Sequence, residues 1–498
     1  MEAFLEQGGR IPLVLLTCNR VDLLRETIQD LRTVRGLGME NIIVVQDGAD
    51  KKVEDLVKRE GLHLHQNRGG VKLRRGQKRE DGAERIAQHY KFALDYAFSQ
   101  RPQAPAVIVV EDDLLFSPDF LEYMEANAPI LERDPTTFVL SAWNDNGFAG
   151  KVKDTSELLR TEFFPGLGWL LPRKLYVQEL SRKWPLSHWD HWMREKAQHK
   201  GRECVFPEVP RTYHNGVKGT FMDQSTHNKL FRDIAYNRDP DVHWEKDPVT
   251  GFPPYAQAIK ENYEARVKAR IASATHVGDF AAVDTTPGAE VVLWYSLPMA
   301  VLTAHNKNPA KPPPFRPLAE HFGLWHEIRR TAHNGMHAFH HDGGSKHVVL
   351  INAALSPYAP LKPDGVQPYE PPLGQRPKTP AAKKREQAQR KAAQEKARLL
   401  KARAADRVGL SCDEVCREGA MVCDKDLFPI INTCAELSKA FPCTKCADSL
   451  GQEQPVYVDP GAPPDKLPGQ CLLTSDIGQS TCQATYPVTK RLCPCRAA

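Results

Sequence analysis

Three consecutive carboxylates, Glu111, Asp112 and Asp113, directly follow the most apolar stretch of the chain, residues 106–110. A β-branched run of this length is typical of a strand buried on both faces of a parallel sheet. Open α/β sheets bind ligands at the carboxyl ends of such strands. Crowded carboxylates repel one another, and Mn²⁺ or Mg²⁺ would relieve the repulsion and grip a diphosphate. The alternative is an acidic turn that merely caps the next helix, with Ser117 as its N-cap.

A second candidate is Asp190, which lies between Trp189 and Trp192 in the chain. A carboxylate held among indoles would have its pKa raised towards the working range of a general base. The alternative is an aspartate that caps the helix containing Met193, with tryptophans that only fill the core.

Strands and helices alternate around these carboxylates, as their apolar periodicity indicates. The expected strands are residues 12–17, 41–45, 62–65, 106–110 and 137–140, and the expected helices are residues 21–34, 53–59, 84–98 and 119–132. Residues 67–81 are rich in Gly, Lys and Arg and are expected to form a loop. This order predicts an α/β fold with a parallel, doubly wound sheet.

The totals predict two or three domains in a chain of 498 residues, 41% of them hydrophobic. The net charge is +5, but residues 376–407 carry 12 basic and 3 acidic residues, a balance of +9. The remainder therefore has a charge of −4. The basic balance belongs to one segment, so we expect no nucleic-acid partner.

Cysteine is concentrated at the end of the chain. Only Cys18 and Cys204 precede residue 400, and ten more lie between Cys412 and Cys495. An even, dense set of this kind predicts disulfides made in an oxidising compartment. Zinc is the alternative, but Cys443 and Cys446 form the only C-x-x-C pair, and no second pair completes a set of four ligands.

The N-terminus contains no hydrophobic signal segment in residues 1–10, and residues 12–17 are too short to span a membrane. An oxidising compartment nevertheless requires targeting. We therefore expect membrane association only through an N-terminal anchor that is absent from this sequence.

Several strings closely resemble the family of N-acetylglucosaminyltransferase I and protein O-mannose β-1,2-N-acetylglucosaminyltransferase. They are residues 11–12, 18–20, 46–47, 87–90, 111–113, 141–147, 160–169, 189–194 and 201–204. The resemblance is dense from residue 11 to 240 and fainter through residues 315–350. It implies a GT-A fold, an inverting mechanism, Mn²⁺ as cofactor and UDP-GlcNAc as donor, with GlcNAc placed on O2 of an α-mannose in the Golgi.

The resemblance also implies a role for each matching residue. Asp113 would bind the metal that bridges the diphosphate, and Asp190 would be the catalytic base. The donor-binding positions would be Arg20, Asp47, His89, Glu111 and Asp112. One base and one metal-binding carboxylate suffice for a single in-line displacement, which needs no covalent nucleophile.

The sequence departs from the family at three places. His191 stands where N-acetylglucosaminyltransferase I has a second aspartate, the loop 215–223 lacks the Val-Ser-His of that enzyme, and the basic stretch 69–79 looks like an insertion. These changes leave two alternatives open: a related transferase with another UDP-sugar or acceptor, such as an O-mannosyl glycan, and a catalytically silent glycan-binding protein.

The chain is expected to divide into four segments. They are a GT-A catalytic domain (11–240), a smaller C-terminal subdomain (241–372), a basic helical linker (373–408) and a disulfide-rich module (409–498). The linker is expected to be a solvated spacer, or to contact anionic polysaccharide or lipid head groups. The module is expected to bind carbohydrate or cell wall, or to act as a dimerisation domain.

Overall fold

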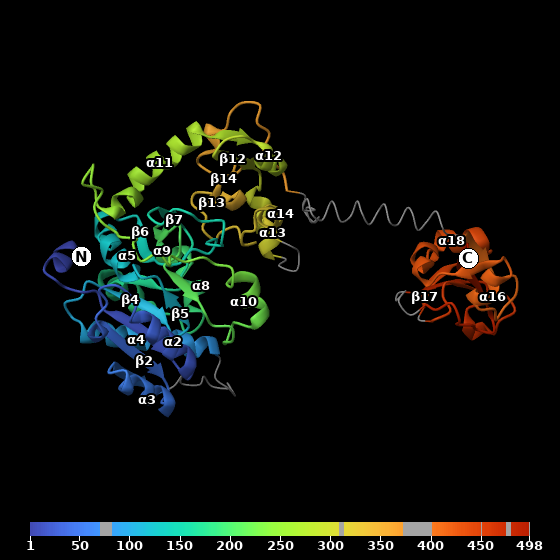
Figure 1. Cartoon of the computed structure of the whole chain (residues 1–498), viewed down its shortest axis with the longest axis horizontal. Helices are drawn as coiled ribbons and strands as arrows, with labels where there is room; N and C mark the ends of the chain where they lie inside the picture. The colour runs from blue at the N-terminus through green and yellow to red at the C-terminus, as the bar shows by residue number, and fades with distance from the viewer. Residues whose placement is uncertain (70–81, 308–312, 372–400, 450, 475–479, 498) are drawn as a thin grey trace. The chain divides into compact units, whose positions relative to one another are not determined.

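The computed structural model describes residues 1–69, 82–307, 313–371, 401–449, 451–474 and 480–497. The chain forms two compact units, Met1–Pro377 and Lys378–Ala498 (Figure 1). Among the described residues, no helix combines the length and apolarity needed to cross a bilayer.

Within the described residues, the first unit is built on an eight-stranded sheet of order β3-β2-β1-β4-β8-β6-β9-β7. The strands are β1 (Leu13–Thr17), β2 (Ile42–Asp47), β3 (His63–Asn67), β4 (Ala106–Glu111), β6 (Thr137–Ser141), β7 (Leu158–Thr161), β8 (Trp169–Pro172) and β9 (Glu203–Pro207). β1 to β4 are parallel, as the alternation predicts. β8 and β7 run antiparallel to their neighbours, so the expectation of an all-parallel sheet is wrong for this half.

Helices cover both faces of the sheet because successive strand side chains point to opposite faces. The helices are α2 (Val21–Leu31), α3 (Lys51–Arg59), α4 (Gly82–Gln100), α5 (Phe120–Asn127) and α8 (Trp189–Met193). Leu13 and Leu15 share one core with α2, α3 and α5, whereas Val14 and Leu16 share the other core with α4 and α8. The carboxyl ends of β1, β2 and β4 are thereby fixed between two packed layers.

The helix expected over residues 119–132 begins and ends differently. Asp119, not Ser117, is the N-cap residue of α5, and its side chain makes no capping hydrogen bond. Residues Leu114–Phe116 form a strand, β5, which pairs with β10 (Thr212–His214). The expected cap is wrong because the Ser117 amide donates to the carbonyl oxygen of Arg211, at 3.0 Å, next to the strand pairing, and the helix starts only at Phe120.

A smaller subdomain follows within the first unit. Its sheet has the order β11-β12-β14-β13, formed by β11 (Thr275–Val277), β12 (Glu290–Tyr295), β14 (Lys346–Asn352) and β13 (Met336–His341). Helices α11 (Lys260–Ser273), α12 (Phe280–Thr285), α13 (Met299–Lys307) and α14 (Arg316–Phe322) accompany it. α10 (Gln224–Leu230) precedes this subdomain and follows β10 in the chain (Figure 1).

The second unit is a small sheet with three short helices in its described part. The strands are β15 (Lys401–Ala404), β16 (Met421–Cys423), β17 (Cys446–Ser449), β18 (Val456–Val458), β19 (Cys471–Thr474) and β20 (Thr489–Ala497), and the helices are α16 (Cys412–Arg417), α17 (Phe428–Ile431) and α18 (Cys434–Ala440). The linker helix expected over residues 373–408 lies mostly outside the described residues. It is wrong for Lys401–Ala404, which pair with β20 as a strand.

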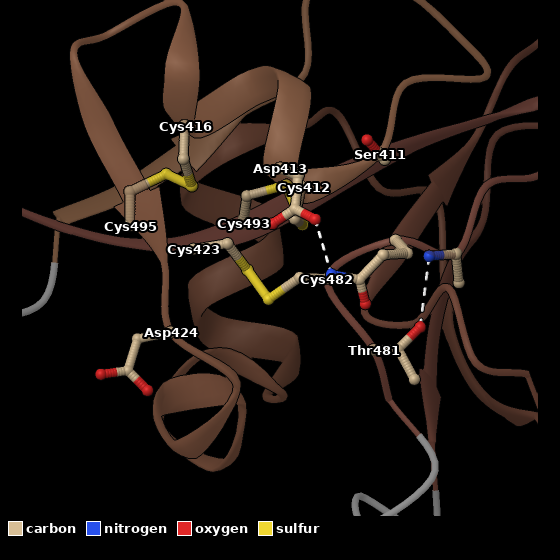
Figure 2. The surroundings of a disulfide bond; sticks show 12 residues. Ser411, Cys412, Asp413, Cys416, Cys423, Asp424, Thr481, Cys482, Cys493 and Cys495 are labelled. Atoms are coloured by element: carbon tan, nitrogen blue, oxygen red, sulfur yellow. Dashed lines mark hydrogen bonds between the residues drawn. A yellow bond between two sulfur atoms is a disulfide. The ribbon is translucent and has the colours of Figure 1, made fainter. Parts of the chain in front are cut away.

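Disulfides join all ten cysteines of this unit, as the sequence predicts. The pairs are Cys412–Cys493, Cys416–Cys495, Cys423–Cys482, Cys434–Cys446 and Cys443–Cys471. Figure 2 shows the first three, two of which tie α16 to β20. Cys443 and Cys446 bond to different partners, so the C-x-x-C pair is not half of a zinc site.

Candidate active site

Glu111 is the last residue of β4, and Asp112 and Asp113 form the turn between β4 and β5. Asp112 and Asp113 are buried, and Arg20 forms ion pairs with both, with its Nη1 lying 2.6 Å from Asp113 Oδ2. Thr17 Oγ1 donates a second hydrogen bond to Asp112, at 2.6 Å. Because β5 separates this turn from α5, the carboxylates do not cap the next helix, and that alternative is excluded.

Burial and neighbouring charges shift the pKa values of Glu111 and Asp112. Burial, reinforced by the neighbouring Asp113, raises the pKa of Glu111 to about 7. Burial also raises the pKa of Asp112 to about 6, even though Arg20 opposes the shift. A cation placed here would favour the ionised forms and relieve the repulsion.

One carboxylate oxygen of Asp113 is not used by the surrounding protein that the structure describes. Its Oδ1 is buried and has no hydrogen-bond partner among the described residues. Gly216 lies so close that an added Cβ would come within 2.6 Å of Asp113 Oδ2. His214, opposite Leu114 in the β5–β10 pairing, places Nε2 3.6 Å from the same oxygen. A buried carboxylate oxygen without a partner fits a hard divalent cation.

A hollow of about 500 Å³ opens beside this turn. All six residues expected to bind donor or metal line it: Arg20, Asp47, His89, Glu111, Asp112 and Asp113. They come from the ends of β2 and β4, the residues after β1, and α4. This is the carboxyl edge of the parallel half of the sheet, where open α/β sheets bind ligands.

Two of these donor-side residues are held by neighbours. Asp47 forms an ion pair of 2.8 Å with Arg85 on α4. His89 Nε2 lies 3.1 Å from the carbonyl oxygen of Val45, and burial lowers the pKa of this histidine. His89 is therefore neutral near pH 7 and can both donate and accept hydrogen bonds.

Asp190 lies in the first turn of α8. Trp189 and Met193 are buried in the core, but the Asp190 side chain is 37% exposed and forms an ion pair of 2.7 Å with Arg194. The expectation that indoles surround the carboxylate is therefore wrong. The helix is anchored by Trp189, whose ring stacks on Tyr90 at a centroid distance of 4.0 Å.

Asp190 lines a second hollow, of about 380 Å³. This hollow adjoins the first, because Ile86, Glu111, His214, Phe221 and Met222 line both. A group between the two hollows would have the acidic turn on one side and the Asp190 carboxylate on the other.

Asp145 and Arg330 also line the second hollow, and the sequence does not predict this. Asp145 bonds Arg330 Nη1 at 2.6 Å through Oδ1, while its Oδ2 is buried without a partner among the described residues. Arg330 lies over the Trp325 ring, 3.9 Å from its centroid. Asp145 belongs to a string that the family resemblance singled out, but nothing in the sequence pairs it with a residue 185 positions away.

The loop 215–223 lies beside both hollows. Gly219 and Thr220 line the first hollow, and Phe221 and Met222 line both. Phe221 is largely exposed, and its ring lies 6.1 Å from that of His188. The basic stretch 69–79 lies outside the described residues except for Gly69.

Two family models match the chain. The model described as "GNT-I family" matches residues 4–296, and the model "Glycosyltransferase family 18" matches residues 385–495. A curated relative, "Alpha-1,3-mannosyl-glycoprotein 2-beta-N-acetylglucosaminyltransferase" of Arabidopsis thaliana, is 39% identical over 235 residues, which are 45% of this chain and 51% of the relative. The chain thus spans about half the length of this relative.

The solved structures that match are less similar to this chain than the Arabidopsis relative is. A mannosyltransferase from Pyrobaculum calidifontis in complex with GDP-Man and Mn²⁺ has a TM-score of 0.26 at 17% identity, covering 41% of this chain and 58% of that one. S. aureus TarS 1–349 in complex with UDP-GlcNAc has a TM-score of 0.29 at 17% identity, and the match covers 42% of this chain and 60% of that one. TM-scores this low support no conclusion about this chain.

The identification therefore depends on the first family model, which covers more than half of the chain, and on the mixed α/β sheet described above. The chain belongs to the GNT-I family, as the sequence predicts, and its first unit has the α/β fold described above.

Proposed function

We propose that the chain is an inverting transferase that moves GlcNAc from UDP-GlcNAc to O2 of an α-linked mannose on a glycoprotein glycan. The observation that carries this proposal is the pair of adjoining hollows, with Asp113 in one, Asp190 in the other and Glu111 in their common wall. The name of the Arabidopsis relative supports the sugar and the acceptor.

In this proposal the first hollow binds the donor. Asp47 and His89 hold the uridine end, Arg20 and Asp112 lie at the diphosphate, and Glu111 supports the sugar. A Mn²⁺ ion held by Asp113 would neutralise the charge that develops on UDP as it leaves. The partnerless Oδ1 of Asp113 supports this assignment.

The second hollow binds the mannose. Asp190 accepts the proton of the O2 hydroxyl as the oxygen attacks C1 of GlcNAc, the bond from C1 to the phosphate oxygen breaks, and UDP departs with that electron pair. One displacement from the opposite face inverts C1. Arg194 orients the Asp190 carboxylate, and Asp145 offers its free oxygen to an acceptor hydroxyl.

We further propose that this reaction takes place in the Golgi lumen. The disulfides of the second unit support an oxidising compartment. The catalytic domain would span residues 11–240 and the subdomain residues 241–372. A linker over residues 373–408 would lead to the disulfide module at 409–498.

A panel of substrates tests the proposal. Purified chain with Mn²⁺ is given UDP-GlcNAc, UDP-GalNAc, UDP-glucose or UDP-galactose, with methyl α-mannoside, a mannose-terminated N-glycan or an O-mannosyl peptide as acceptor. We expect UDP-GlcNAc to be used fastest and the product to carry a β1,2 linkage by NMR. Preference for another UDP-sugar would identify a different transferase. Donor binding without transfer to any acceptor would identify a silent binding protein.

A further inference from the structure

One disulfide of the second unit is more exposed than the others. Among the five disulfides that the structure describes, four have at least one buried cysteine. The Cys434–Cys446 pair has none, because Cys434 is exposed and Cys446 is only partly buried. Exposed disulfides exchange most readily with thiols in solution, since a thiolate must reach one of the two sulfur atoms. A soluble thiol therefore reaches this pair most easily.

Cys446 lies beside a second disulfide, Cys443–Cys471. Strands β17 and β19 are parallel, and Cys446 is the register partner of Cys471 in that pairing. Neighbouring strands lie about 4.8 Å apart, and the Cα atoms of disulfide-bonded cysteines are usually about 4.4–6.8 Å apart. Cys471 bonds to Cys443, and their Cα atoms are 5.4 Å apart. Both cysteines of the C-x-x-C segment therefore lie within bonding reach of Cys471.

Backbone hydrogen bonds hold the C-x-x-C segment against β19. The Cys471 amide donates to the carbonyl oxygen of Lys445 at 2.8 Å. The amide and the hydroxyl of Thr444 donate to the carbonyl oxygen of Gly469, at 2.9 Å and 2.8 Å. None of these bonds involves α18. When the disulfide to that helix opens, Cys446 therefore stays next to Cys471.

We propose that these two disulfides form a redox-sensitive switch in which Cys471 exchanges Cys443 for Cys446. The thiolate of a soluble monothiol such as glutathione attacks Sγ of Cys434, a mixed disulfide forms, and Cys446 leaves as a thiolate. That thiolate attacks Sγ of Cys471, the Cys446–Cys471 bond forms, and Cys443 leaves as a thiolate that takes up a proton. A second monothiol attacks the mixed disulfide and releases Cys434 as a thiol. Two monothiols are thereby oxidised to one disulfide, and Cys434 and Cys443 are reduced.

The switch acts on helix α18, which begins at Cys434. The disulfide to Cys446 ties the start of this helix to β17. The Thr433 side chain caps the helix and Leu437 is buried, so the helix keeps local support when the disulfide is lost. The exchange therefore loosens α18, whereas Cys471 on β19 retains a disulfide to the C-x-x-C segment.

Graded mixtures of reduced and oxidised glutathione test the proposal on the full chain. Free thiols are blocked with N-ethylmaleimide, the chain is digested with trypsin without reduction, and the disulfide-linked peptides are identified by mass spectrometry. The four cysteines of the switch fall on four different peptides, because trypsin cleaves after Lys425, Lys439, Lys445, Lys466 and Lys490. The native Cys443–Cys471 link and the exchanged Cys446–Cys471 link are therefore distinguished directly.

We expect Cys434 to be labelled or glutathionylated at least ten-fold faster than Cys423, which is not buried but bonds to the buried Cys482. Labelling of Cys443 and the Cys446–Cys471 link should appear together with it. Hydrogen exchange of the α18 amides should become at least ten-fold faster, while that of the β20 amides stays unchanged. The matched control is Cys434→Ala/Cys446→Ala, which lacks the attacking thiolate and should keep Cys443 unlabelled in the same glutathione mixture.

Opening of all five disulfides together would overturn this inference, and so would earlier opening of the Cys423–Cys482 bond. Opening of Cys434–Cys446 with Cys443 still bonded to Cys471 would also overturn it, because no exchange would have taken place. Labelling of Cys443 at the native rate in the double variant would show direct reduction instead. If the double variant fails to fold, the linked peptides of the native chain decide. None of these outcomes depends on the function proposed for the first unit.

Discussion

Tyr90 donates a hydrogen bond of 2.6 Å to Glu111, joining helix α4 to the acidic turn after β4. The ring of the same tyrosine stacks on Trp189, the neighbour of Asp190. One buried side chain thus connects the donor hollow with the helix that carries the proposed base. The position of the carboxylates relative to Asp190 depends on this contact.

Tyr90→Phe keeps the ring stack and removes the hydroxyl. Because a buried acceptor loses its donor, we expect a loss of about 1–2 kcal/mol in the free energy of unfolding. We also expect weaker UDP-GlcNAc binding, since the Glu111 carboxylate is no longer oriented. Urea unfolding and calorimetry measure the two effects. Tyr123→Phe is the control, since it removes a buried hydrogen bond to Ser141, also of 2.6 Å. Equal donor affinity in the two variants would contradict the role given to Tyr90.

Asp190→Asn removes the proposed base while keeping its shape. A positioned base contributes about 10²- to 10⁴-fold to the rate, so we expect kcat to fall by that factor. UDP-GlcNAc affinity should change less than about two-fold, because Asp190 does not line the donor hollow. Initial rates and calorimetry measure both quantities. Glu195→Gln is the control, because Glu195 is exposed and lines neither hollow, and this variant should keep its activity. Surviving turnover in Asp190→Asn would show that the base lies elsewhere.

The sequence predicts that the residues proposed to bind donor and metal lie together, and they line one hollow. Arg20, Asp47 and Asp113 each follow a strand of the parallel half, and parallel strands bring their carboxyl ends to one edge. The surroundings of Asp190 differ from the prediction, because the indole of Trp189 packs into the core while the Asp190 carboxylate turns to Arg194. Periodicity reports which residues are buried in a helix but not which distant side chain meets an exposed one.

Pairing between strands that are distant in the chain explains two further differences between the predicted and the observed secondary structure. Ser117 is a residue type that often caps helices. However, β5 pairs with β10, which the chain reaches nearly one hundred residues later. Lys401–Ala404 have helix-forming residues, but they form a strand against β20, whose cysteines are bonded to α16. In both places tertiary structure overrides local propensity.

Arg160 is buried between two carboxylates, Asp134 at 2.8 Å and Glu203 at 2.6 Å. Arg160→Met removes the guanidinium from both carboxylates, and only Glu203 keeps other charged partners, Lys260 and His333. Removing one member of a buried ion pair costs about 3–5 kcal/mol. We expect that loss in urea unfolding followed by tryptophan fluorescence, since all 8 tryptophans lie before residue 326. Arg32→Met, at a largely exposed pair with Glu60, should cost under about 1 kcal/mol. Similar losses in both variants would contradict this account.

The Cys412–Cys493 disulfide closes a long loop, because its cysteines have a sequence separation of 81. In the chain-entropy model, its removal should destabilise the second unit by about 4.5 kcal/mol. Pulse proteolysis of the full chain in urea, with cleavage mapped to residues 401–497, measures the unfolded fraction for Cys412→Ala/Cys493→Ala. The Cys434–Cys446 bond spans only 12 positions, and its removal should cost about 3 kcal/mol. A larger loss for the shorter loop would contradict the entropic explanation.

His333 links the main sheet to the subdomain through two carboxylates. Its Nδ1 lies 3.1 Å from Glu203 and its Nε2 lies 2.9 Å from Glu264. Burial alone would lower the pKa of His333, but these carboxylates outweigh it and raise the pKa above the usual 6.5. The pKa of Glu264 is lowered from 4.5 to about 2, because hydrogen bonds from His333 and Tyr358 outweigh its burial.

The sign of the resulting pH dependence follows from these shifts. A raised histidine pKa contributes stability that is complete below pH 6.5 and is lost as pH rises through the folded value. A lowered carboxyl pKa contributes stability that is complete above pH 4.5 and is lost at lower pH. The cluster should therefore stabilise the first unit most between pH 4.5 and 6.5.

His333→Gln removes the histidine's share of this stability, so its destabilisation should be largest near pH 5.5 and should shrink towards pH 9. Urea unfolding followed by tryptophan fluorescence across this range measures it. His337→Gln is the control with the opposite sign. Burial lowers the pKa of His337 to about 4, so the native histidine costs stability as pH falls below 6.5. The His337→Gln variant should therefore lose less stability than the native chain on acidification. A His333→Gln effect that does not vary with pH would show that His333 is neutral in the folded chain.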